Sequence, residues 1–203
     1  MPAEKRFSKN GTILKRRSHI DMTEGNKLQC NFFESDVLYV APGLIGKILV
    51  MRSGPLSPGR FIITETEAYR GEEDKACHAC KGRTPRTEVM YHEGGKIYVY
   101  FVYGMYWMLN FVAGTKNDPQ AVLIRGIEGF NGPGKLTKAL GIDRSYYGED
   151  LTTSQRIWVE DTGIKPIIKT GPRIGINYAG DLWKNKPWRY YTPPTPKPPK
   201  GGL

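Results

Sequence analysis

The sequence predicts one domain of mixed α and β structure, in which short helices stand beside several antiparallel strands. Short runs rich in β-branched and aromatic residues recur along the chain with Gly and Pro turns between them, as expected of strands. Two further segments carry the start and stop signals of helices. The 203 residues, 39% of them hydrophobic, suffice for a single core, and 24 Gly with 15 Pro predict many turns.

The predicted strands fall into two neighbouring pairs and several single strands. Residues 47–51 and the run from Phe61 to Tyr69 are separated by a Gly- and Pro-rich turn, so we expect them to be antiparallel neighbours. Residues 97–102 and 106–113 form the second pair, and Gly104 between them permits a tight reversal. Single strands are expected at residues 121–127, 156–160, 173–177 and 186–191.

Two helices and one long loop complete the domain. Asp36 precedes an apolar run from Val37 as a helix cap would, and Pro42-Gly43 is expected to kink or split that helix. Residues 132–141 have Pro near the start and Gly at the end, which is typical of a short helix. Residues 70–96 lack periodicity and predict a long functional loop.

The two ends of the chain differ in composition from the domain between them. Residues 1–28 are basic and predict a flexible arm, residues 192–203 form a Pro-rich tail, and residues 29–191 form the domain. No apolar run approaches the length of a membrane span, and the N-terminus has no apolar signal segment. We therefore expect a soluble protein that is not exported by a cleaved signal.

The charge balance favours a polyanionic partner. The formal net charge is +10, and each phosphate contacted by Lys or Arg releases condensed counterions, so nucleic acid is the favoured ligand over a mere solubility balance. The three cysteines cannot build a disulfide framework and suit a reducing compartment. Cys77-His78-Ala79-Cys80 resembles half of a zinc site, but neither Cys30 nor His92 supplies a second pair of ligands. We interpret Cys77 and Cys80 as ordinary thiols beside a functional histidine, with zinc as a minor alternative.

Two groups of side chains suggest chemistry. On a strand, Glu65, Glu67 and Tyr69 share one face, and a carboxylate among aromatic rings in a partly dry pocket can act as a general base. For a single glutamate, a solvated strand face is the commoner explanation. Tyr98 and Tyr100 also share a face, where they could stack on bases, and an aromatic residue at a hairpin tip could wedge between base pairs.

A larger set of motifs carries a resemblance to a known family. The motifs are Glu65-Thr-Glu67-Ala-Tyr69, Asp74-Lys-Ala-Cys-His78, Arg83-Thr-Pro-Arg86, Tyr98-Val-Tyr100-Phe-Val-Tyr103-Gly-Met-Tyr106, Asn110, Leu123-Ile-Arg125, Gly132-Pro-Gly-Lys-Leu-Thr-Lys-Ala-Leu140 and Arg173-Ile-Gly-Ile-Asn-Tyr-Ala-Gly-Asp-Leu-Trp183. Together they resemble the alkyladenine type of 3-methyladenine DNA glycosylase over residues 31–191. Glu65-Thr-Glu67-Ala-Tyr69 alone would be weak, but the combination is specific.

The resemblance implies a single compact mixed α/β (α+β) domain on a curved, largely antiparallel sheet, with a protruding hairpin and short helices. It also implies a monofunctional base-excision enzyme that flips out alkylated or deaminated purines and hydrolyses the N-glycosidic bond. Neither a metal nor another cofactor takes part in that chemistry. No lysine stands among the matched catalytic residues, so no lyase step is expected. The expected substrate is double-stranded DNA containing damaged purines, bound by a monomer in the cytoplasm near the nucleoid, or in the nucleus of a eukaryote.

The resemblance assigns a role to each matched position. Glu67 would activate the water, and Arg125 would help to position the water and the nucleotide backbone. Tyr103 would be the intercalating wedge, and Arg83 and Arg86 would hold phosphates. The pocket around the flipped base would be formed by Tyr69, His78, Tyr100 and Asn110, of which Asn110 crowds the amino group of normal guanine. The departures are small: Cys77 and Cys80 flank His78, and Phe101 and Trp107 are bulky.

Two alternatives remain at this point. A metal-dependent nuclease could use Glu65, Glu67 and Asp74 as Mg²⁺ ligands, although the aromatic residues would then be unexplained. A non-enzymatic nucleic-acid-binding module would use only the basic arm and the tyrosines.

Overall fold

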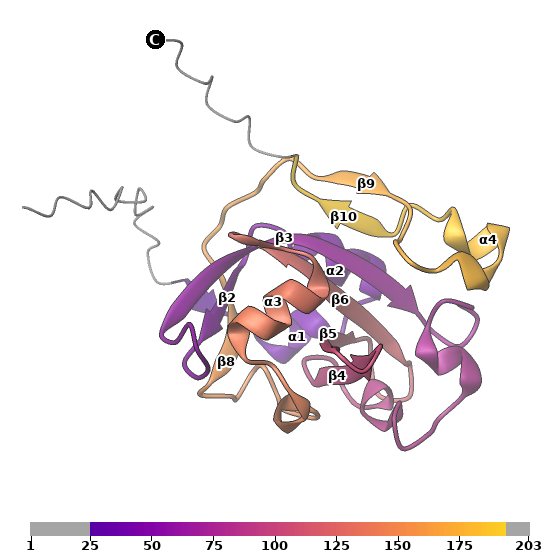
Figure 1. The fold of residues 1–203 in the computed structure, drawn as a ribbon, viewed down its shortest axis with the longest axis horizontal. Helices are drawn as coiled ribbons and strands as arrows, with labels where there is room; N and C mark the ends of the chain where they lie inside the picture. Colours follow the sequence, from indigo (N-terminus) through magenta and orange to yellow (C-terminus); the bar gives the residue numbers. More distant parts are fainter. Residues whose placement is uncertain (1–24, 194–203) are drawn as a thin grey trace, which may run out of the picture.

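The strand β3 (Gly59–Arg70) runs through the middle of a ten-stranded sheet in the computed structural model, which describes residues 25–193 (Figure 1). The main path of the sheet is β1-β8-β2-β3-β6-β5-β4, with β7 added beside β6 and β10 joining β3 to β9, and every pair is antiparallel. The other strands are β1 (Asn26–Lys27), β2 (Ile48–Met51), β4 (Ile97–Val102), β5 (Tyr106–Ala113), β6 (Gln120–Ile127), β7 (Phe130–Asn131), β8 (Ile157–Asp161), β9 (Lys169–Gly171) and β10 (Arg189–Tyr191).

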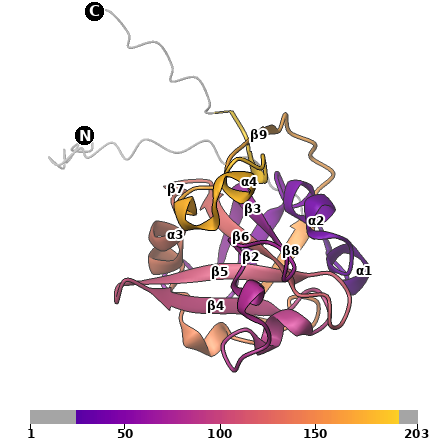
Figure 2. The same ribbon diagram turned by 90° about the vertical axis from the view of Figure 1, so that its right-hand side faces the viewer.

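The sheet curls, and a register irregularity contributes to the bend. The pairing of β3 with β6 shifts on both sides of Glu65, and such bulges bend and twist the strand that carries them. The first half of β3 pairs with β2, whereas Glu65–Glu67 pair with β10. The predicted single domain on a curved antiparallel sheet with short helices and a hairpin is therefore confirmed (Figures 1 and 2).

Alternation along the central strands separates a packed face from a functional face. Ala68 on β3, Val99 on β4, Phe111 on β5 and Ile124 on β6 all belong to the main core. Their neighbours point to the opposite face, because successive residues of a strand alternate. The opposite face carries Tyr98 and the predicted site residues Glu67, Tyr69, Tyr100, Asn110 and Arg125.

Helices cover the packed face. In α2 (Val37–Gly43) the Asp36 carboxylate accepts a hydrogen bond from Leu38 N at 2.8 Å, as the sequence predicts, and the helix ends at Gly43 directly after Pro42. In α3 (Pro133–Leu140) Pro occupies the first turn and Gly141 ends the helix with a left-handed φ of 69°. Two one-turn helices are α1 (Cys30–Phe33) and α4 (Asp181–Lys184). Four 3₁₀ turns are η1 (His78–Lys81), η2 (Glu88–Tyr91), η3 (Arg144–Tyr146) and η4 (Asn177–Ala179).

The hairpin of β4 and β5 projects from the body of the domain (Figure 2). Its strands match the predicted residues 97–102 and 106–113. The turn closes through a hydrogen bond from Met105 N to Val102 O at 3.0 Å, with φ of 53° at Tyr103 and 65° at Gly104. Two successive left-handed residues give the turn whose twist suits a hairpin.

The prediction of a strand over residues 173–177 is wrong. The chain bends there instead, because Gly175 adopts a φ of 79° and the Ile174 N–H donates to the carboxylate of Glu67 rather than to a strand. The loop predicted at 70–96 is present, and it contains the 3₁₀ turns η1 and η2.

The predicted basic arm lies outside the described residues up to residue 24, while Asn26–Lys27 pair with β8 as strand β1. The Pro-rich tail also lies outside them from residue 194 onward. Among the helices of residues 25–193, none has the length and apolar character needed to cross a bilayer.

Candidate active site

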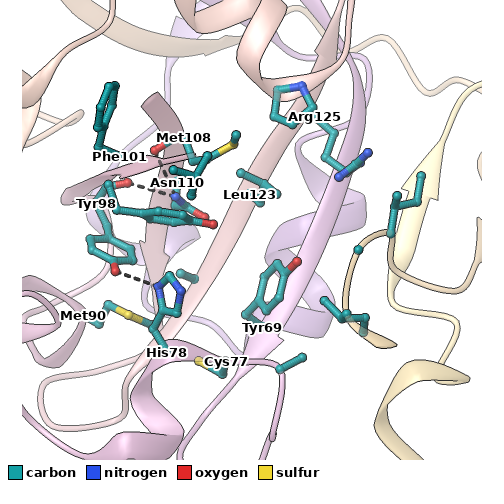
Figure 3. Close-up of a pocket in the computed structure, with 18 of the residues that line it drawn as sticks. Tyr69, Cys77, His78, Met90, Tyr98, Phe101, Met108, Asn110, Leu123 and Arg125 are labelled. Atoms are coloured by element: carbon teal, nitrogen blue, oxygen red, sulfur yellow. Dashed lines mark hydrogen bonds between the residues drawn. The ribbon is translucent and has the colours of Figure 1, made fainter. Parts of the chain in front are cut away.

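A cavity of about 440 Å³ opens on the functional face of the sheet (Figure 3). Strands β3 to β6 supply its floor, the loop leading into η1 supplies one wall, and residues 174–178 supply the opposite wall. The predicted residues that line it are Tyr69, His78, Arg86, Tyr100, Tyr103, Asn110 and Arg125. Its volume falls within the range of roughly 300–1,000 Å³ that is common for small-molecule pockets.

Glu67 lies directly behind the lining of this cavity and has no exposed surface. One carboxylate oxygen accepts the Tyr69 hydroxyl hydrogen at 2.8 Å, and the other accepts the Ile174 N–H at 2.7 Å. Burial raises the pKa of Glu67, whereas the Arg125 guanidinium and these two hydrogen bonds oppose the rise. The alternative of a solvated strand face is therefore wrong for this glutamate.

Arg125 lies between two carboxylates. Its Nε is 3.1 Å from Glu65 Oε1 and 3.4 Å from Glu67 Oε1, and its side chain is only 12% exposed. The same oxygen of Glu65 accepts from Arg189 Nη1 at 3.1 Å, so β10 helps to hold Glu65 against Arg125. This arrangement fixes a positive charge beside the buried Glu67 carboxylate.

His78 stands against two tyrosines on the other side of the cavity. Its Nδ1 lies 2.8 Å from the Tyr98 hydroxyl (Figure 3). Its ring meets that of Tyr100 edge-to-face, with the ring centres 4.6 Å apart. Burial, followed by the positive charges of Arg86 and Lys81, lowers the pKa of His78 to about 4. The imidazole is therefore neutral at pH 7 and acts as an aromatic and hydrogen-bonding wall.

Tyr69 and Asn110 complete the polar lining. Burial, followed by the negative charge of Glu67, raises the pKa of Tyr69 well above its usual value, so Tyr69 remains a hydroxyl donor. Asn110 is 3% exposed, and its amide nitrogen donates to Tyr98 O at 3.1 Å and to Met108 O at 3.2 Å. These bonds hold the amide rigidly at the cavity surface.

Tyr103 projects at the hairpin tip beside the cavity mouth. The residue is 86% exposed, so its ring is open to contact from outside the domain. The two bulky residues on the same hairpin pack on one another, because the rings of Phe101 and Trp107 are 4.9 Å apart. They stiffen the element that carries Tyr103.

The two predicted phosphate-binding arginines differ in their surroundings. Arg86 lines the cavity, and its guanidinium lies 5.1 Å from the centre of the Tyr100 ring. Arg83 lies outside the cavity lining and donates two hydrogen bonds to Glu88, at 2.6 and 2.8 Å. Arg83 would therefore have to exchange Glu88 for a phosphate, whereas Arg86 would not.

The carboxylates proposed for a metal-dependent nuclease do not assemble. Asp74 is fully buried and its two oxygens accept from Arg173, apart from the pair of Glu65 and Glu67. Cys77 is buried in the cavity wall, where burial raises its thiol pKa to about 12, and Cys80 Sγ faces Lys75 O at 3.8 Å. Within residues 25–193 no three His, Cys, Asp or Glu residues are grouped as metal ligands.

Comparison with known proteins agrees with this geometry. The family described as methylpurine-DNA glycosylase matches residues 31–131 and 128–196. The chain belongs to this family. As a member it is a DNA glycosylase, an enzyme that cleaves the bond between a base and its sugar.

Curated relatives of the glycosylase come from several organisms. A protein of Psychrobacter cryohalolentis is 46% identical over 180 residues, which cover 74% of this chain and 85% of the relative. One from Rickettsia felis is 45% identical over 166 residues, covering 78% and 89%, and one from Methanocella arvoryzae is 42% identical over 186 residues, covering 82% and 92%. All three are named "Putative 3-methyladenine DNA glycosylase".

Sequence reasoning missed one wall of the glycosylase cavity. Ile174, Gly175, Ile176 and Tyr178 line it, and the first three of them lie in the strand that was predicted over residues 173–177. A signal was present in Gly175, since a glycine inside a short apolar run often marks a bend or a close approach. Nothing in the local pattern indicated that the Ile174 N–H would meet Glu67.

Proposed function

We propose that this glycosylase removes alkylated or deaminated purines, of the 3-methyladenine, 7-methylguanine and hypoxanthine type, from double-stranded DNA. The damaged nucleotide would be flipped into the cavity, and a water activated by Glu67 would hydrolyse the N-glycosidic bond. The observation that carries the proposal is a buried carboxylate, bound to Arg125 and Tyr69, directly behind a ring-lined cavity. The names of the curated relatives support the class of substrate.

The cavity suits a flipped base. A base within a duplex cannot be reached, so it must rotate out, at a cost of a few kcal/mol that is lowest for damaged pairs. His78, Tyr69 and Tyr100 present aromatic surface on which a purine can stack, with Asn110 beside them. Tyr103 at the mouth would fill the gap that the flipped nucleotide leaves in the stack.

The charges suit cleavage of a glycosidic bond. Positive charge develops on the sugar as the bond breaks, and a carboxylate at Glu67 stabilises it and orients the water. Because Glu67 has no exposed surface, the water has to enter where Tyr69, Arg125 and Ile174 meet, since these three cavity-lining residues contact the carboxylate. A cationic base such as 3-methyladenine leaves without an acid, whereas hypoxanthine needs a hydrogen bond to the leaving purine.

We also propose the oligomeric state of the enzyme, its place in the cell and its contacts with the DNA backbone. The enzyme would act as a monomer on the genome, near the bacterial nucleoid or in a eukaryotic nucleus. Arg86 and Arg125 would contact phosphates, with Arg83 joining them after leaving Glu88. The net charge of +10 would assist each of these contacts.

The test is release of free base from defined DNA. The enzyme is incubated in EDTA with duplexes that contain 3-methyladenine, hypoxanthine or only normal bases, and the products are separated by chromatography. We expect free damaged purine and an intact strand with an abasic site, and no release from the normal duplex. Nicked strands, or loss of all activity in EDTA, would instead support the nuclease. Tight binding of lesion DNA without any base release would support a binding module.

A further inference from the structure

We propose that the buried pair of Asp74 and Arg173 is a positioning device, which holds the floor and both walls of the cavity together and places the Ile174 N–H on the Glu67 carboxylate. This inference rests on the proposed function. It assigns a role in the reaction to two residues that touch neither the water nor the base.

The pair itself is closed to solvent. Both side chains have 0% exposure, Arg173 Nη2 donates to one oxygen of Asp74 at 2.9 Å, and Nη1 donates to the other. A two-pronged contact of this kind fixes the angle as well as the distance between the partners. Removing either partner would leave the other charge buried without compensation, so the contact stays closed in the folded protein.

Asp74 connects the pair to the loop that carries His78. Its carboxylate also accepts the N–H groups of Arg70, at 3.1 Å, and of Ala76, at 3.0 Å. These bonds fold the chain that follows β3 back on itself, just before Cys77 and His78 enter the cavity wall. One carboxylate therefore determines where the His78 loop begins.

Arg173 connects the pair to strand β3 in the floor and to the C-terminal segment. Its Nη1 donates to Ala68 O at 2.9 Å, next to both Glu67 and Tyr69, and its Nη2 lies 3.3 Å from Trp183 O. The guanidinium also lies 4.9 Å from the centre of the Tyr69 ring and 5.0 Å from that of Trp188. Strand β3 and the C-terminal segment thus meet on one guanidinium group.

The position of Arg173 affects Glu67 through a single peptide unit. Ile174 follows Arg173 directly, and its N–H donates to Glu67 Oε1 at 2.7 Å. The groups that face Glu67 are Arg125, Tyr69, Glu65 and this N–H, and Arg189 on β10 binds Glu65 behind them. The N–H is the one member of this group that reaches Glu67 from the bend at residues 173–176, and the guanidinium of Arg173 anchors that bend.

The experiment compares Arg173→Lys with a matched control. Lysine keeps the charge but cannot make the two-pronged contact, so the bend should loosen. The control is Arg156→Lys, because Arg156 likewise pairs with a carboxylate, Glu149, and stacks on a ring, Tyr146 at 4.0 Å, but does not line the cavity. Asp74→Glu is the second variant, because it keeps both charges of the buried pair but shifts the carboxylate, if Arg173→Lys fails to fold.

Three measurements are made on each protein: the single-turnover rate of base release with pH, the affinity for undamaged DNA, and hydrogen exchange at residues 174–176. In Arg173→Lys we expect a rate loss of about tenfold or more, of the size that a small misplacement of a reacting group produces. The acidic limb of the pH profile should move to higher pH, because the N–H bond to Glu67 weakens. Affinity for undamaged DNA should stay within about twofold, and exchange should quicken.

The outcomes separate the inference from the proposed function. A rate loss no greater than that of Arg156→Lys, or a loss with an unmoved acidic limb, would overturn the positioning role. Unchanged exchange at Ile174 would overturn it as well. If the wild-type enzyme releases no base from any lesion, the proposed function fails, and the exchange comparison still decides whether Arg173 holds the bend.

Discussion

His78 Nδ1 lies 2.8 Å from the hydroxyl oxygen of Tyr98, and burial in the cavity wall shields the imidazole from water. The folded protein lowers the pKa of His78 from 6.5 to about 4, so the fold favours the neutral ring. Between those two pH values the unfolded chain binds more protons than the folded one. The contribution of the neutral His78 ring to the free energy of unfolding is therefore complete above about pH 6.5, and it declines as the pH falls toward 4.

The difference between the folded and unfolded pKa values of His78 predicts that this one side chain makes the stability of the protein depend on pH. When the pH is lowered from 7 to 5, the free energy of unfolding should fall by on the order of 2 kcal/mol because of His78. In His78→Phe that part of the decline should be absent. Urea unfolding at the two pH values measures it, and His92→Phe, at a half-exposed histidine paired with Glu88, is the control. Equal declines in wild type and His78→Phe would show that His78 is not the source.

The second prediction concerns the carboxylate. Glu67→Gln keeps the shape of the side chain but removes the negative charge that would activate the water. We expect a loss of base release of about 10²–10⁴-fold, the range typical of general-base removal, with lesion DNA still bound. Single-turnover rates and band-shift titrations measure the two quantities. Glu128→Gln, at an exposed glutamate after β6, is the matched control and should behave as wild type. Full activity in Glu67→Gln would contradict the proposed mechanism.

The strands around the cavity could be predicted because their signals are local. Gly104 and the flanking β-rich runs predicted both arms of the hairpin, which the structure confirms at Ile97–Val102 and Tyr106–Ala113. The two-residue period then placed Glu67 and Tyr69 on one face without any knowledge of the fold. The pattern also placed the two strands of each pair side by side, whereas the single curved sheet that joins the pairs was expected from the resemblance.

The bend at residues 173–176 could not be predicted in the same way. Its alternation of apolar residues is that of a strand, and the contact that decides otherwise is with Asp74, 99 residues earlier in the chain. Full burial of Glu67 could not be predicted from the neighbouring sequence either, because Ile174 from the same bend covers the carboxylate. Long-range partners of buried charges are the part of this site that one sequence does not reveal.

The third prediction concerns Tyr103, which is 86% exposed with a φ of 53°. Tyr103→Ala removes the wedge and should weaken lesion binding and flipping more than the chemical step. Tyr103→Gly should do the same while it raises hairpin stability by about 1 kcal/mol, because glycine accepts a positive φ without strain. Stopped-flow fluorescence of a base analogue reports flipping, and single-turnover rates report chemistry. Tyr39→Ala, at a 77% exposed tyrosine on α2, is the control. A loss confined to the chemical rate would contradict the wedge.

The last prediction concerns the charge that Arg125 places beside Glu67. Burial raises the pKa of Glu67, and Arg125, at 3.4 Å, lowers it, so Arg125→Gln should let that pKa rise further. A carboxylate with a higher pKa takes up its proton at higher pH, so the acidic limb of the rate profile should move upward. Single-turnover rates across the pH range, with enzyme in excess, measure the shift apart from any loss of DNA affinity. Arg144→Gln removes an equal charge from the exposed turn η3 and should leave the limb in place. If both variants moved the limb equally, the effect would come from net charge and not from the contact between Arg125 and Glu67.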